Sequence, residues 1–240
     1  MNEKDFCRIV NWYPVLGEHS AVCGFLKLSE EEIKLLADGV GEGKQVKSVI
    51  SRLKKVMRSV DANYCFVSTD YCSPTDTERF EAKHGSVHSA ESAWLYLALS
   101  QKVRNAAMNG QIEYLAVRPF ERIDRTREFR LFVKDGELKA MSQYNLVRHF
   151  RRLEGIKKRL WRNTSKWFEN IKPLLPVKDL VIDCYLKNDD RDVKIIDINP
   201  WGEPTDPLLL QTFDRDWSEV IGLKLMLPPT KISGDVAVSF

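Results

Sequence analysis

The chain has 240 residues, with 37 basic and 34 acidic side chains and a formal net charge of +3. Charged residues make up 30% of it and hydrophobic residues 43%, a globular balance that excludes a disordered or fibrous chain. The small net charge gives no ground for nucleic-acid binding, and no apolar run approaches the roughly 20 residues that cross a bilayer. The first ten residues contain no apolar signal-peptide core, so we expect a cytoplasmic protein without a membrane partner.

Segments rich in β-branched and aromatic residues, with apolar or alternating patterns, predict strands. These segments are 6–10, 65–68, 114–118, 128–133, 138–143, 180–186 and 193–198. Helical patterns lie between them, at 29–39, 44–57, 90–108 and 149–170. The first of these helices has Ser29 as its N-cap, acidic residues in its first turn and Gly39 at its end.

The predicted elements fall into two blocks. The block up to about residue 110 is rich in helix, whereas the second contains two strand pairs. Asp135-Gly136 predicts a tight hairpin in the first pair, and a polar loop at 187–192 joins the second. We therefore expect one α+β domain over residues 1–240, with an N-terminal lobe of about 1–110, a C-terminal lobe of about 111–240 and a cleft between them.

An acidic group of residues lies on the last strand pair. Asp197 and Asn199 are two apart and share a face of their strand, and Asp183 lies on the preceding one. If the two strands are antiparallel neighbours, these three oxygen donors converge. Carboxylate, amide and phosphate oxygens are what Mg²⁺ prefers. The set predicts a magnesium–nucleotide site; the alternative is that Asp197 and Asn199 merely begin a turn.

A second group is basic. Arg118 ends one predicted strand, and Glu128 and Arg130 share a face of the next. Guanidinium groups suit phosphate oxygens. From these residues alone, an ordinary Glu–Arg pair within a sheet is the favoured alternative.

Other motifs are less informative. Residues 39–44 are rich in glycine, but Asp38 and Gln45 stand where a phosphate-binding P-loop needs glycine and Ser or Thr. His84 and His88 have no neighbouring cysteine or glutamate, so a metal pair is disfavoured.

The helix at 149–170 carries a strongly basic stretch over residues 148–162, with Glu154 as the single acid there. For this basic stretch we favour a solvent-exposed helix face. A contact surface for an acidic partner is the second interpretation, and nucleic-acid binding is the third.

Together, these residues resemble the cell division cycle protein 123 family, a divergent branch of the ATP-grasp fold. The resemblance is carried by Val117-Arg118, by Glu128-Phe129-Arg130, and by Phe132-Val133-Lys134 with Ser142-Gln143; by Asp179-x-Val181-x-Asp183-x-Tyr185; and by Ile196-Asp197-x-Asn199-Pro200-x-Gly202-Glu203-x-Thr205-Asp206-x-Leu208-Leu209. Looser matches in the first third are Trp12-Tyr13-Pro14, Leu28 with Asp38-Gly39, and Ser73-Pro74-x-Asp76.

The resemblance implies two lobes that clasp Mg–ATP. It places magnesium on Asp183, Asp197 and Asn199, and it also implies a set of nucleotide contacts. These are Val117, Arg118, Glu128 and Arg130, with Ser68 at a position where the family has a phosphate-reaching lysine and Lys102 as the candidate for a second such lysine. Because Ser68 is neutral, we expect the loss of one lysine–phosphate contact to weaken nucleotide binding by about tenfold to a hundredfold unless another cation substitutes.

In eukaryotes the family acts as an ATP-dependent assembly factor, or chaperone, for translation initiation factor 2. It binds the gamma subunit of that factor, so this subunit is the partner implied for a eukaryotic source. The alternative function is an ATP-grasp enzyme that joins a carboxylate to an amine through an acyl phosphate. Nucleic acid is the least favoured partner.

Overall fold

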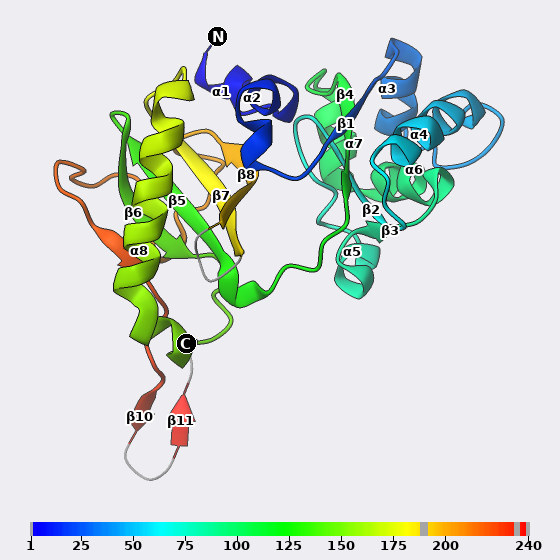
Figure 1. Ribbon diagram of the computed structural model, residues 1–240. Helices are drawn as coiled ribbons and strands as arrows, with labels where there is room; N and C mark the ends of the chain where they lie inside the picture. The colour runs from blue at the N-terminus through cyan, green and yellow to red at the C-terminus, as the bar shows by residue number, and fades with distance from the viewer. Residues whose placement is uncertain (1, 188–191, 233–235, 239–240) are drawn as a thin grey trace. The chain divides into compact units, whose positions relative to one another are not determined.

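A computed structural model describes residues 2–187, 192–232 and 236–238. The chain divides into two compact units, and each is described separately (Figure 1). The N-terminal unit contains Arg8–Gly17 and Ala21–Arg122. The C-terminal unit contains Met1–Cys7, Glu18–Ser20 and Ile123–Phe240. The second unit thus takes two short segments from the start of the chain as well as its latter half.

The N-terminal unit is built on a four-stranded antiparallel sheet of order β1-β4-β2-β3. Its strands are β1 (Gly24–Lys27), β2 (Cys65–Thr69), β3 (Ser86–Val87) and β4 (Tyr114–Pro119). The expected division near residue 110 is corrected here to 122/123. The reason is that β4 lies between β1 and β2 and completes this sheet, a long-range pairing that local pattern does not reveal.

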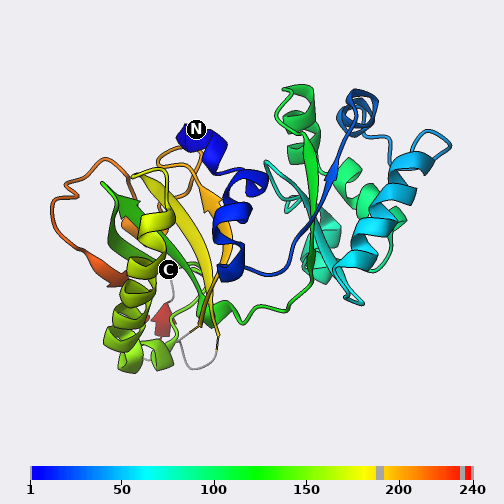
Figure 2. The ribbon, with the colours of Figure 1, turned by 45° about the horizontal axis from the view of Figure 1, so that its top comes forward.

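Helices pack on the sheet face that carries Val67, Leu115 and Val117. The helices of this unit are α2 (Ile9–Leu16), α3 (Glu30–Ala37), α4 (Lys47–Ser59), α5 (Glu78–Lys83), α6 (Ala90–Leu99) and α7 (Gln101–Met108). Figure 2 shows α4 and α6 on the same side of the sheet. The apolar faces of α3, α4, α6 and α7 join these strand residues in one core.

Two sequence-based expectations in this part of the chain are wrong. The predicted strand at 6–10 is instead the end of α1 (Glu3–Phe6) and the start of α2. Phe6, Ile9, Trp12 and Leu16 are all buried, and their spacing of three to four residues is that of a helix. The single helix expected at 90–108 is two, because Ser100 is extended, and its hydroxyl accepts the Val103 N–H at 3.1 Å to cap α7.

The N-cap of α3 is confirmed and forms a capping box. The Ser29 hydroxyl accepts the Glu32 N–H at 3.3 Å, and the Glu32 carboxylate accepts the Ser29 N–H at 2.9 Å. Gly39 follows the helix with a φ of 69°, a conformation that favours glycine.

Ser29→Ala is expected to lower the free energy of unfolding by about 1 kcal/mol, because it leaves an N-terminal amide of α3 without its acceptor. Urea denaturation followed by circular dichroism measures this. Ser51→Ala, at an exposed position inside α4, is the matched control and should change stability by less than about 0.5 kcal/mol. Equal losses in the two variants would contradict the capping role.

The C-terminal unit has a five-stranded sheet of order β8-β7-β5-β6-β9, antiparallel except for the parallel pair β6–β9. Its strands are β5 (Glu128–Lys134), β6 (Glu137–Gln143), β7 (Leu180–Lys187), β8 (Asp192–Asn199) and β9 (Gly222–Lys224); β10 (Thr230–Ile232) and β11 (Val236–Val238) form a separate pair. The predicted Asp135-Gly136 turn joins β5 and β6, with both residues at positive φ. Of the polar loop expected between β7 and β8, residues 188–191 lie outside the described residues.

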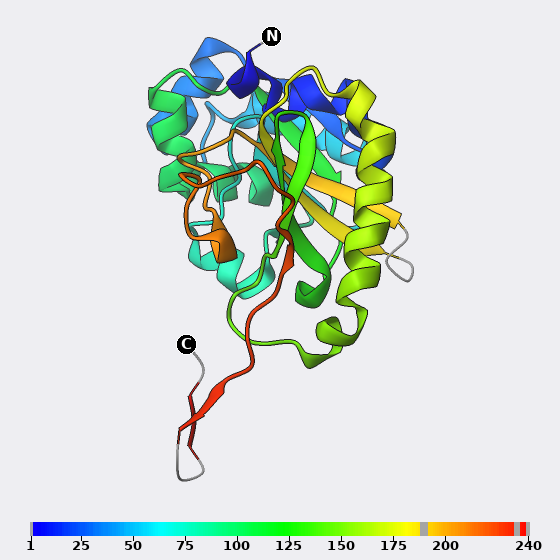
Figure 3. The ribbon, with the colours of Figure 1, turned by 90° about the vertical axis from the view of Figure 1, so that its left-hand side faces the viewer.

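The long helix α8 (Arg151–Ile171) runs along one face of this sheet (Figures 1 and 3). It packs there through Leu153, Leu160 and Phe168, which are buried. Short 3-10 turns complete the two units: η1 (Gly17–His19), η2 (Arg125–Arg127), η3 (Lys172–Leu174) and η4 (Leu208–Leu210). Among the described residues, no helix combines the length and hydropathy needed to cross a membrane.

Candidate functional site

A row of polar residues crosses the sheet of the C-terminal unit on a single face. Arg130 on β5 lies opposite Ser142 on β6 and opposite Asp183 on β7, and Asp183 lies opposite Asp197 on β8. Partners directly opposite in an antiparallel pair project from the same face. The antiparallel neighbours expected from the sequence are therefore present, and they bring Arg130 and both aspartates together. Asn199, two residues beyond Asp197, extends the row.

Arg130 and Asp183 form a bidentate ion pair at the centre of this row. The Arg130 Nε and Nη2 atoms donate to the two carboxylate oxygens at 2.7 and 2.8 Å. Nη1 donates to the Asp206 carbonyl at 2.7 Å, and the guanidinium lies 5.1 Å from the centre of the Tyr144 ring. Both partners are only 6% exposed. Although burial opposes the charge, the Asp183 contacts raise the pKa of Arg130, which stays charged.

Two β8 side chains, Asn199 and Asp197, lie at the end of the row. The Asn199 Nδ2 donates to Asp183 Oδ2 at 3.0 Å, so a third residue orients that carboxylate. Asp197 accepts the N–H of Ile198 at 3.0 Å. A β-bulge lies at this point, because Asp183 pairs with Asp197 whereas Cys184 pairs with Ile195. Bulges often occur beside binding sites, where they re-aim side chains.

The donor set suits a hard divalent cation. Two carboxylates lie opposite one another, and like charges in that position repel. Arg130 supplies one balancing positive charge, so a cation beside Asp197 would further reduce the repulsion. Within the described residues, no cluster of three or more His, Cys, Asp or Glu side chains is placed to hold a metal ion. The set is thus two carboxylates and an amide, which fits Mg²⁺ because this ion keeps waters and phosphate oxygens among its ligands.

Glu128 lies two residues before Arg130 on β5, opposite Tyr185. The Glu–Arg pair favoured from the two residues alone is not formed, since Arg130 pairs with Asp183 across the strands. Burial, and secondarily the Asp183 charge, raise the pKa of Glu128 to about 7, against the opposing effect of Arg130. Near neutral pH this carboxyl is therefore poised between its two protonation states.

Glu128→Gln is expected to make stability less dependent on pH. The folded state holds a proton at Glu128 up to about pH 7, whereas the ordinary value is 4.5, so the parent loses stability as pH rises through this window. The variant avoids a loss of up to about 3 kcal/mol. Urea denaturation at acidic and mildly alkaline pH measures the difference. The exposed Glu219 provides the control, Glu219→Gln, and a parent and Glu128→Gln with parallel pH profiles would refute the prediction.

The other predicted nucleotide contacts lie in the N-terminal unit. Val117 on β4 is 0% exposed and belongs to the core, so only its backbone could meet a ligand. Arg118 lies opposite Phe66 of β2, and its guanidinium is 5.5 Å from the centre of the Phe66 ring. Ser68 is 3% exposed and shares that sheet face. Lys102 is an exposed residue of α7 instead, and its N–H donates to Asp76 at 2.9 Å.

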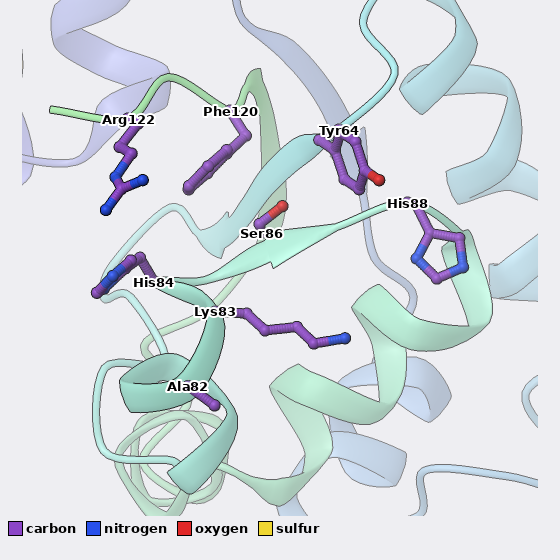
Figure 4. A pocket seen from close by; sticks show the side chains of 8 residues that line it. All are labelled: Tyr64, Ala82, Lys83, His84, Ser86, His88, Phe120 and Arg122. Atoms are coloured by element: carbon purple, nitrogen blue, oxygen red, sulfur yellow. The ribbon is translucent and has the colours of Figure 1, made fainter.

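A cavity of about 470 Å³ opens beside β3 in the same unit (Figure 4). Its lining combines aromatic with basic side chains: Tyr64, Ala82, Lys83, His84, Ser86, His88, Phe120 and Arg122. The rings of Tyr64 and His88 meet edge to face with centres 6.5 Å apart. His84 and His88 lie on opposite sides of the cavity in Figure 4. Aromatic faces and cations together suit a planar, anionic ligand.

Sequence reasoning missed this cavity and part of the polar row. The cavity residues are spread over 64–122, and the sequence analysis considered only two of them, His84 and His88, as a disfavoured metal pair. Tyr144 and the Asp206 carbonyl, which hold Arg130, were also missed. Asp206 belongs to the family motif that follows β8, but nothing in the sequence links its carbonyl to Arg130, and Tyr144 carries no such signal.

These features define an α+β protein made of two compact units. The D123 family model matches residues 29–222, and the chain belongs to this family. The resemblance to the cell division cycle protein 123 family is thereby confirmed.

Curated relatives and a solved structure agree with this family membership. A "Translation initiation factor eIF2 assembly protein" from Aspergillus fumigatus is 33% identical over 112 residues, which cover 46% of this chain and 25% of that protein. "Cell division cycle protein 123" from Candida glabrata is 34% identical over 110 residues, covering 45% and 29%. The chain thus spans about a quarter of the length of these relatives. C-terminally truncated Cdc123 from Schizosaccharomyces pombe superposes with a TM-score of 0.78 at 19% identity, covering 92% of this chain and 95% of that one. This likeness confirms the predicted fold class.

Proposed function

We propose that the chain binds Mg–ATP and acts in the cytoplasm as an ATP-dependent assembly factor for a multisubunit protein complex. The observation that supports this best is the polar row on β5, β7 and β8. Arg130, Asp183, Asp197 and Asn199 converge on a single sheet face although up to 69 positions separate them in the sequence. A buried ion pair with a second carboxylate beside it is costly for stability alone, so a binding role explains it better.

Each residue has a distinct role in this proposal. Asp183, Asp197 and Asn199 hold Mg²⁺, which neutralises phosphate charge when bound. Arg130 positions the Asp183 carboxylate, because its guanidinium contacts Asp183, the Asp206 carbonyl and the Tyr144 ring. Glu128, half-buried and near the same charges, adjusts the net charge of the site with pH.

In the N-terminal unit, four residues are further proposed nucleotide contacts. Arg118 and Ser68 share a sheet face. Lys102 is exposed and lies two residues after Ser100, the N-cap of α7. The backbone of Val117 is the fourth predicted contact. The aromatic and basic lining of the cavity beside β3 is chemically compatible with a nucleotide. The relatives support the assembly role, since one is named for eIF2 assembly and another is cell division cycle protein 123. For a eukaryotic source, the proposed partner is the gamma subunit of translation initiation factor 2.

Isothermal titration calorimetry with ATP tests the nucleotide half of the proposal. Saturable heat that depends on Mg²⁺ is expected, and the absence of heat at millimolar ATP would refute it. Co-purification with a multisubunit partner, strengthened by Mg–ATP and without ADP release, is the result expected of an assembly factor. ADP release on addition of amino acids or peptides would instead identify a carboxylate–amine ligase.

A further inference from the structure

The cavity beside β3 has an aromatic border, formed where β2 begins and β4 ends. β2 and β4 pair through Cys65 and Pro119, and the Phe120 N–H donates to the Tyr64 carbonyl at 2.9 Å, which continues the pairing by one step. Residues directly opposite in an antiparallel pair project from the same face. The rings of Tyr64 and Phe120 thus face the same side, and Figure 4 shows both along one border of the cavity.

The opposite border is the turn from α5 into β3. His84 ends α5 with a φ of 53°, and Gly85 follows with a φ of 81°. A Cβ atom at Gly85 would lie 2.7 Å from the Phe66 ring, so both the positive φ and this close approach favour glycine. The His84 N–H donates to the Phe80 carbonyl at 2.7 Å. The backbone therefore fixes this turn, which brings the exposed side chains of Lys83 and His84 to the cavity.

The cavity carries positive charge. Lys83 and Arg122 line it together with two histidines, whereas none of its described lining residues is an aspartate or a glutamate. Both cations are exposed, and neither forms an ion pair with any residue in the described part of the chain. Clefts that are lined by charge of one sign concentrate ions of the opposite sign. Imidazole N–H groups add hydrogen-bond donors whether or not the ring is protonated. This chemistry selects an anion.

The cavity also offers aromatic surface to its occupant. Tyr64 is 56% exposed, and Phe120 is half-buried. The volume of about 470 Å³ lies within the roughly 300–1,000 Å³ of small-molecule sites, so a bare inorganic anion would leave most of it empty. In Figure 4 the two rings and Lys83 lie on opposite sides of Ser86. A planar ring stacked on the aromatic border, with an anionic group directed at Lys83, would contact both borders.

We propose that this cavity binds a small aromatic phosphate, without a metal ion, at a site separate from the magnesium–nucleotide site. Tyr64 and Phe120 stack on the ring, and Lys83 and Arg122 bind the phosphate oxygens. The lining is chemically compatible with a nucleotide, but it includes none of the four residues proposed to contact one in this unit, and it offers no carboxylate to hold Mg²⁺. This inference goes beyond the proposed function and stands whether or not the chain binds Mg–ATP.

Fluorescence anisotropy of methylumbelliferyl phosphate, a planar fluorescent phosphate, tests the proposal on the full chain in EDTA. Saturable binding is expected, with displacement by phenyl phosphate. Inorganic phosphate lacks the ring and phenol lacks the phosphate, so each should displace the fluorescent compound at least about tenfold more weakly than phenyl phosphate does. The absence of saturable binding, or equal displacement by phenyl phosphate and inorganic phosphate, would overturn the proposal.

Matched variants at exposed positions locate the site. Tyr64→Ala is expected to weaken binding at least about tenfold, because it removes a stacking surface. Tyr71→Ala, at an exposed tyrosine of the same unit outside the cavity, should change affinity less than about threefold. Lys83→Gln should also weaken binding about tenfold, because a charge-assisted hydrogen bond is lost. Its control is Lys54→Gln, at an exposed position of α4. Circular dichroism establishes that the variants are folded, and equal losses within either pair would overturn the site.

Two variants separate this site from the magnesium–nucleotide site. Asp197→Asn should bind methylumbelliferyl phosphate as the parent does, whereas Lys83→Gln should retain the Mg–ATP heat of the parent. If Lys83→Gln loses that heat as well, the cavity is part of the nucleotide site and the proposal is wrong. A parent without Mg–ATP heat would refute the proposed function alone, because the titration in EDTA needs no metal.

A phosphotyrosine peptide distinguishes a free compound from a modified residue of a partner protein. Phenyl phosphate carries the same ring and phosphate without a peptide backbone. We expect the peptide to displace methylumbelliferyl phosphate no better than phenyl phosphate does, since the lining matches the ring and the phosphate alone. Displacement by the peptide at least about tenfold stronger would assign the cavity to a partner protein and would overturn the small-molecule site.

Discussion

Asp197→Asn is expected to abolish Mg²⁺-dependent ATP binding while leaving the fold intact. Asparagine has nearly the shape of aspartate and retains an oxygen that can accept the Ile198 N–H, which Asp197 accepts at 3.0 Å. It lacks the negative charge that a divalent cation requires. The substitution also removes one of two carboxylates that lie opposite each other on β7 and β8. Without ligand, the variant should be as stable as the parent, or more stable by up to about 1 kcal/mol.

Two measurements separate binding from folding. Calorimetry should show Mg²⁺-dependent heat for the parent and none for Asp197→Asn. A ligand at a hundred times its dissociation constant stabilises its protein by about 2.7 kcal/mol, so Mg–ATP should raise the melting temperature of the parent alone. Asp214→Asn, at an exposed position of the same unit, is the matched control and should behave like the parent. If Asp197→Asn binds Mg–ATP as the parent does, the metal assignment is wrong.

The polar row was predictable because strand alternation is a local property. Alternating residues in 180–186 and 193–198 place Asp183 on one strand and Asp197 with Asn199 on the next, and a short connection makes these strands antiparallel neighbours. On β8 the buried residues Val193, Ile195 and Ile198 mark the buried face, whereas on β7 every residue from Leu180 to Cys184 is buried and the pattern alone does not select a face. The structure pairs Asp183 with Asp197 as this reasoning requires.

What surrounds Arg130 could not be predicted in this way. Its ion pair is with Asp183, 53 positions away, and its third contact is with a backbone carbonyl 76 positions away. The pairing of β4 with β1 is equally non-local, and it moves the boundary between the units past residue 120. Local pattern identifies elements, whereas partners brought together by long connections depend on how the whole unit packs.

Arg130→Met is expected to destabilise the C-terminal unit by about 3–5 kcal/mol, because it leaves the Asp183 carboxylate buried without its cation. The side chain of Asp183 is 8% exposed and receives two hydrogen bonds from Arg130, at 2.7 and 2.8 Å. Methionine fills much of the space but donates no hydrogen bond, so the Asp206 carbonyl also loses a partner.

Lys134→Met is the matched control, since Lys134 lies on the same strand and pairs with Asp179, but both side chains are 27% exposed. That pair should contribute no more than about 1 kcal/mol. Urea denaturation followed by tryptophan fluorescence compares the two variants. Arg130→Met combined with Asp183→Asn should recover much of the loss, because no unpaired charge then remains buried. A cost for Arg130→Met as small as that of Lys134→Met, or a double variant no better than the single one, would show that the ion pair does not hold Asp183 in place.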